Sequence, residues 1–121
     1  MTPEAFSTLA GRLGAAVKVK PVLDTIQFRV GARGFATLGW PEKGRAVVKL
    51  SLKDQAAALA LSDAVRIDQS RPRNSGLTLI WLERIDEDAM AYILTAAFSE
   101  AYAKTARSRP GRGRAATLGV G

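Results

Sequence analysis

The side chains in this chain that could do chemistry are mostly arginines and lysines. The 121 residues include 18 basic and 11 acidic side chains, which gives a net charge of +7. Residues 18–53 hold eight of the basic side chains and only two acidic ones, Asp24 and Glu42. Positive charge concentrated in one stretch is typical of a protein that meets a polyanion, although the same charge also serves solubility on an ordinary surface.

Seven basic positions within and after this stretch are candidates for contacts with phosphate groups. Three of them alternate with apolar residues in two predicted strands, and the others lie in turns and in a later loop. Pairing of these strands in the register that buries the apolar residues would bring the three strand residues to one outer face. A basic face with projecting loops can hold the phosphates of a nucleic acid. Trp40, in the second turn, is a candidate for stacking on a base or, equally, for simple packing. The seven candidates are Arg29, Arg33, Lys43, Arg45, Lys49, Arg71 and Arg73.

Catalytic and metal-binding patterns are scarce. The chain has no histidine and no cysteine, which excludes Ser–His–Asp triads, thiol nucleophiles and zinc sites built from these ligands. The carboxylate cluster Asp86-Glu87-Asp88 falls at a predicted helix start, where acidic side chains cap N–H groups and complement the macrodipole. Gly31-Ala32-Arg33-Gly34 joins two strands and lacks the pattern of a phosphate-binding loop. We therefore expect a non-enzymatic protein with no cofactor and no metal.

The basic residues lie in a set of short predicted strands or in the turns and loop that join them. Alternating apolar and polar residues predict strands at 25–30, 35–38 and 45–50, joined by turns that contain glycine. A short edge segment is expected within residues 15–24, because the residue before Pro21 disfavours the helical region. A brief extended piece follows the middle of the chain at Val65-Arg66-Ile67-Asp68. The apolar run 77–82 predicts a central strand that is covered on both faces.

Three helices are predicted around these strands. Thr2-Pro3-Glu4 is typical of a helix start, and Ser51-Leu52-Lys53-Asp54 resembles a capping box ahead of a helix at 52–62. The third helix begins near Asp86 and continues to residue 104 with a broad apolar face. The expected fold is a single α+β domain, residues 1–104, with an antiparallel sheet of about four to five strands. Residues 105–121, rich in glycine and arginine, are expected to form a flexible tail.

The order of these elements is distinctive, and it is accompanied by five short segments, residues 2–6, 28–31, 33–38, 48–51 and 55–59. Together they resemble the MmcQ/YjbR family. The resemblance covers roughly residues 2–104. It implies a small α+β domain with a curved antiparallel sheet and helices at each end, similar to the secretion-chaperone type of fold. Members are commonly described as predicted DNA-binding proteins with a double-wing arrangement, and Arg33 and Lys49 match basic positions of the family pattern.

Two functions follow from these observations as expectations. The first is a cytoplasmic, non-enzymatic module that binds DNA through the basic sheet face and its loops. The second is a protein-interaction or chaperone-like adaptor, acting as a homodimer or with a protein partner, in which the charge serves solubility. A membrane partner is not expected, because no apolar run approaches the ~20 residues of a membrane span and the first residues lack a signal-peptide pattern.

Overall fold

The protein forms one six-stranded antiparallel sheet with three α-helices, in a computed structural model that describes residues 1–108. The strand order is β1-β2-β3-β4-β6-β5, and every neighbouring pair is antiparallel. The sequence predicted about four to five strands, and the number is larger because both expected edge segments pair with a neighbour. The strands are β1 (Val17–Val22), β2 (Thr25–Val30), β3 (Arg33–Leu38), β4 (Arg45–Lys49), β5 (Val65–Ile67) and β6 (Leu77–Trp81).

The three α-helices begin where the sequence predicted. The side chains of Thr2, Ser51 and Asp86 each accept a hydrogen bond from the N–H group three residues on, at 3.0, 3.1 and 2.8 Å. These bonds satisfy N–H groups that have no partner inside the helix. The last helix continues to Ser108, so residues 105–108, which were expected in the tail, are its final turn. The remainder of the predicted tail, 109–121, lies outside the described residues. The helices are α1 (Pro3–Gly11), α2 (Leu52–Leu61) and α3 (Glu87–Ser108), and a short 3-10 helix, η1 (Leu82–Arg84), precedes α3.

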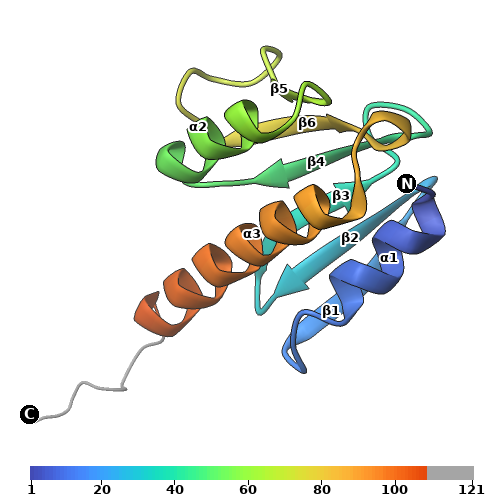
Figure 1. Cartoon of the computed structure of the whole chain (residues 1–121). Coiled ribbons are helices and arrows are strands. Elements are labelled where there is room, and N and C mark those ends of the chain that lie inside the picture. The colour runs from blue at the N-terminus through green and yellow to red at the C-terminus, as the bar shows by residue number, and fades with distance from the viewer. Residues whose placement is uncertain (109–121) are drawn as a thin grey trace, which may run out of the picture.

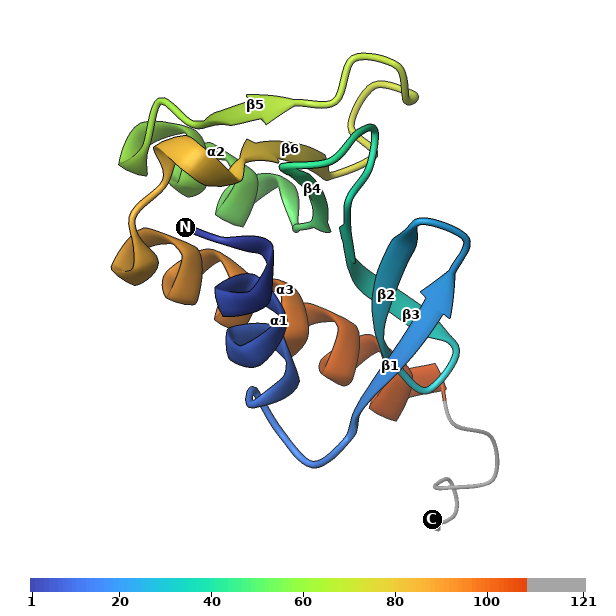
Figure 2. The same cartoon turned by 90° about the vertical axis from the view of Figure 1, so that its right-hand side faces the viewer.

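All three α-helices lie on the same side of the sheet (Figures 1 and 2). The long helix α3 crosses β2, β3 and β4, α1 lies against β1 and β3, and α2 lies against β5 and α3. The sheet curves around α3, as Figure 2 shows. The molecule therefore has a helix side and an uncovered side, which we call the outer face.

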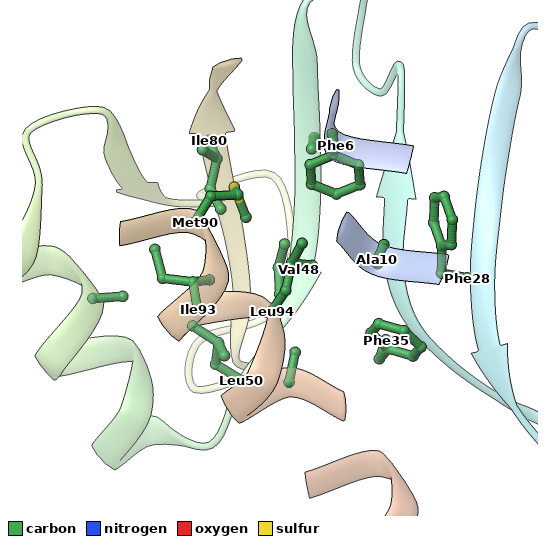
Figure 3. Close-up of a cluster of buried hydrophobic side chains, with 14 of the residues drawn as sticks. Phe6, Ala10, Phe28, Phe35, Val48, Leu50, Ile80, Met90, Ile93 and Leu94 are labelled. Carbon is green, nitrogen blue, oxygen red and sulfur yellow. The ribbon is translucent and has the colours of Figure 1, made fainter. Parts of the chain in front are cut away.

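The core lies between the helices and the inner face of the sheet (Figure 3). Phe6 of α1, Phe28 of β2 and Phe35 of β3 are each at most 1% exposed, and the first two rings meet edge to face with centroids 5.8 Å apart. Full burial of such a side chain stabilises the folded state by about 1.5–3 kcal/mol. The same core contains three large side chains of α3 and three from β4, its C-terminal junction and β6: Met90, Ile93, Leu94, Val48, Leu50 and Ile80.

Strand pairing confirms the predicted register of the first strands. Ile26 pairs with Leu38, and Ala36 pairs with Val48, so the alternating apolar residues face the helices together. The prediction that β6 is covered on both faces is wrong. Thr78 and Ile80 are fully buried toward the helices, whereas the three apolar residues that alternate with them are half-buried on the outer face. An apolar run alone does not show whether a second layer covers it.

Candidate nucleic-acid interface

The outer face is basic because of the residue types at its strand positions. Side chains alternate between the two faces of a strand, so the register places six charged side chains on the outer face, and all six are positive. None of the six strands contains an aspartate or a glutamate. The charged residues of the outer face are Lys18, Lys20, Arg29, Arg45, Lys49 and Arg66.

One row of outer-face residues crosses the whole sheet, with one residue from each strand. It begins and ends with a basic side chain, and polar and then apolar side chains lie between them. With strands ~4.8 Å apart, five spacings give this row a width of about 24 Å. The row is Lys20, Gln27, Thr37, Val47, Leu79 and Arg66, in the order of the strands across the sheet.

Arg29, Arg45 and Lys49 share the outer face, as the alternation predicted. The seven predicted residues are nevertheless divided between the two ends of the sheet. Lys43 and Arg45 lie at the end where β4 begins. The antiparallel register places the remaining five at the other end, where β2 and β4 finish and the loop between β5 and β6 returns: Arg29, Arg33, Lys49, Arg71 and Arg73.

Arg45 interacts with two carboxylates and an aromatic ring. Its Nη1 atom lies 3.1 Å from Oε1 of Glu83, and its Nη2 atom lies 3.9 Å from Oε2 of Glu42. The guanidinium also stacks over the ring of Trp81, 4.7 Å from the ring centroid, and the side chain is only 20% exposed. The two carboxylates offset the charge of Arg45, so less of its positive charge is available to an anion.

The other predicted residues differ in their contacts and in their exposure to solvent. Arg71, whose side chain is about half exposed, lies 3.9 Å from a carboxylate oxygen of the largely buried Asp68 side chain. The Nη2 atom of Arg29 donates to the carbonyl oxygen of Ala32 at 2.8 Å, so this arginine folds back onto the β2–β3 turn. The remaining four side chains are exposed: Arg33, Lys43, Lys49 and Arg73.

Sequence reasoning missed four residues of the outer face. Lys18 and Lys20 alternate along β1 and are exposed, and this spacing of two was a signal that the ambiguous segment around Pro21 obscured. Arg66 and Trp81 come together only through the pairing of β5 with β6, and the Arg66 guanidinium lies 5.9 Å from the Trp81 ring centroid. Trp40, the aromatic candidate from the sequence, is 46% exposed in the loop between β3 and β4.

The helix side of the molecule carries acidic side chains and a shallow hollow. Asp86 caps α3, and Glu87 and Asp88 are exposed in its first turn. A hollow of about 580 Å³ along α2 and α3 is lined by residues that include Asp54, Tyr92 and Glu100. Within residues 1–108, no group of three or more aspartate and glutamate side chains is placed to hold a metal ion. In the same range, no helix combines the length and the apolar character that a membrane crossing requires.

The fold and this face together define a class: a small α+β domain whose helices cover one side of a single antiparallel sheet and whose other side is open and basic. No model of a protein family, no curated protein and no solved structure matches the chain.

Proposed function

We propose that this protein is a non-enzymatic module that binds DNA, with the phosphate backbone held on the outer face and by the loops at its ends. The observation that carries the proposal is the charge of the sheet: every charged strand residue is basic. Contacts of lysine and arginine with phosphates release condensed counterions, and this release supplies most of the affinity of non-specific nucleic-acid binding. The proposal includes the MmcQ/YjbR family as the relationship that best fits the order of the elements.

The residues proposed to contact phosphate extend across the sheet. Lys18 and Lys20 extend the basic surface to its β1 edge, and Arg66 lies at its β5 edge. Lys49 lies between these edges on β4, and the exposed Arg73 projects from the loop after β5. Because the surface is wide and free of strand carboxylates, several phosphates can be neutralised at once, and affinity should depend steeply on salt.

The test is the salt dependence of DNA binding by the full chain and two matched double variants. Fluorescence anisotropy with an oligonucleotide of about 20 bases, longer than the roughly 4–16 nucleotides that a compact face covers, gives log K at each salt concentration. Lys20→Ala with Lys49→Ala should reduce the slope by about 1.4–1.8, since each contact contributes roughly 0.7 for a single strand and 0.9 for a duplex. The control, Arg12→Ala with Lys53→Ala, removes the same charge from exposed positions at the end of α1 and on α2 and should leave the slope nearly unchanged.

Three results would contradict the proposal. If both double variants change the slope equally, DNA binding depends on the net charge of the protein and not on the outer face. If the outer-face variant binds like the parent while removal of residues 109–121 abolishes binding, the sheet is not the binding surface. Absence of salt-dependent binding, together with a stable homodimer, would instead support the protein-interaction alternative.

A further inference from the structure

The outer face carries an apolar strip beside its basic residues. Trp81, Leu79 and Leu77 occupy the outward positions of β6, and Val47 of β4 lies next to Leu79 in the register. Val47 is only 8% exposed and lies outside the hydrophobic core cluster, although no described helix covers this side of the sheet. Outward strand positions on an uncovered face are usually polar. Val47 is buried, whereas Leu77, Leu79 and Trp81 keep part of their surface exposed, so the three β6 side chains are the part of this strip that a ligand could contact.

Basic and polar side chains lie on both sides of this strip. Arg66 pairs directly with Leu79 at the β5 edge, and Thr37 pairs with Val47 on the opposite side. Beyond Thr37 the same row continues through Gln27 to Lys20 at the other edge of the sheet. A ligand that lies across the sheet therefore meets positive charge, hydrogen-bonding groups, an apolar surface and positive charge again.

A single strand of nucleic acid matches this order of basic, polar and apolar side chains across the sheet. Its phosphates are anionic, its base edges carry hydrogen-bond donors and acceptors, and its unpaired bases have flat apolar faces. A duplex hides those faces in its stack, and its major groove, ~12 Å wide, admits a helix or a two-stranded ribbon. An outer face about 24 Å wide cannot enter that groove, so a duplex would contact it through phosphates alone and leave the apolar strip unused.

We propose that the outer face binds single-stranded DNA, with phosphates on Lys18, Lys20 and Arg66 and unpaired bases against Leu77, Leu79 and Trp81. The inference rests on the proposed function, because it uses the same phosphate contacts. The guanidiniums of Arg45 and Arg66 lie over the Trp81 ring, 4.7 and 5.9 Å from its centroid. The three side chains form a platform, since guanidinium planes and indole rings both stack on bases.

The experiment compares a labelled oligo-dT strand of about 20 bases with a mixed-sequence duplex of equal length, for the full chain at matched salt. We expect the single strand to bind at least about tenfold more tightly. Leu77→Ser with Leu79→Ser should weaken single-strand binding about tenfold or more, given the stacking contribution per base, and should leave duplex binding unchanged. Leu52→Ser with Leu61→Ser is the control, because both leucines are 49% exposed on α2, away from the outer face. Urea unfolding of each variant verifies that it is folded.

A second readout follows the indole directly. The chain has two tryptophans, so Trp40→Phe leaves Trp81 as the sole source of tryptophan fluorescence. The single strand should quench this signal, and the duplex should not. This measurement does not depend on the leucine variants and remains informative if those variants fail to fold.

The outcomes separate the inference from the proposed function. Equal or tighter duplex binding, with no effect of the leucine changes and no quenching of Trp81, overturns the inference while the proposed function stands. No salt-dependent binding to either DNA overturns both. A homodimer that dissociates when Leu77 and Leu79 are changed identifies the strip as a protein interface and also overturns the inference.

Discussion

Replacement of Gly76 by alanine should destabilise the fold more than any other glycine-to-alanine change at a described position. Gly76 is buried at the end of the loop that carries Arg71 and Arg73, with a φ of +81°. A Cβ atom added at this position would overlap the carbonyl oxygen of Leu50. The Gly76 carbonyl in turn accepts a hydrogen bond from the Leu50 N–H at 2.9 Å. The added carbon therefore meets backbone on the β4–α2 junction, which cannot move without breaking that bond.

The expected cost has two parts. A non-glycine residue at positive φ costs roughly 1–2 kcal/mol, and forcing an extra carbon into a packed site typically costs about 1–3 kcal/mol more. Together these give a loss of about 2–5 kcal/mol, a large share of the roughly 5–15 kcal/mol that stabilises a typical domain. With a urea m-value of ~1.5 kcal/mol/M, the unfolding midpoint should fall by roughly 1.3–3.3 M.

Equilibrium urea unfolding, followed by circular dichroism, measures this shift. Gly34→Ala is the matched control, because a Cβ atom added there would have no atom within 4 Å beyond its chain neighbours and the φ of Gly34 is not positive. Alanine in a strand is more favourable than glycine by about 0.5–1 kcal/mol, so this control should be neutral or slightly stabilising. A Gly76→Ala midpoint within about 0.3 M of the parent would refute the argument from the Leu50 contact.

Two further predictions concern the outer face and the core. Glu83→Gln removes the carboxylate 3.1 Å from Arg45 and should steepen the salt slope of DNA binding by up to about 1, whereas Glu100→Gln, the same charge change on α3, should not; an equal effect of both would show that net charge alone matters. Gln55→Ala removes a buried side chain whose Nε2 atom donates to Thr78 Oγ1 at 3.0 Å and should cost about 2–3 kcal/mol in urea unfolding. A Gln55–Thr78 double-mutant cycle with a coupling energy near zero would contradict the role of that hydrogen bond, for which about 1 kcal/mol is expected.

The parts of the fold that were predictable from sequence depend on local patterns. Alternation in 25–30 and 45–50 determined which side chains face the core, and the hydroxyl and carboxylate caps marked the helix starts. The edge strand β1 was ambiguous because proline is unfavourable in most strands. Pro21 is tolerated because β1 pairs only with β2 and can leave a position on its free edge without an N–H donor.

The candidate site was predictable to a smaller extent, for a related reason. Period-two spacing placed Arg45 and Lys49 on one face, but it could not show that Glu83, 38 residues away, would offset the charge of Arg45. Nor could it show that β6 lies uncovered on its outer side. Both facts depend on tertiary contacts between residues that are far apart in the sequence. A local sequence pattern does not report such contacts.

Acidic side chains gather on the helix side of the molecule, opposite the basic outer face. The carboxylates that line hollows along α2 and α3 include those of Asp54, Glu100 and the first turn of α3, and all of them lie on the helix side. DNA that approaches from this side meets negative charge, whereas DNA that approaches the outer face meets the lysines and arginines of the strands. Specific surfaces commonly combine attraction at one site with repulsion elsewhere. If the proposed function holds, these helix-side carboxylates would favour encounters at the sheet without touching the ligand.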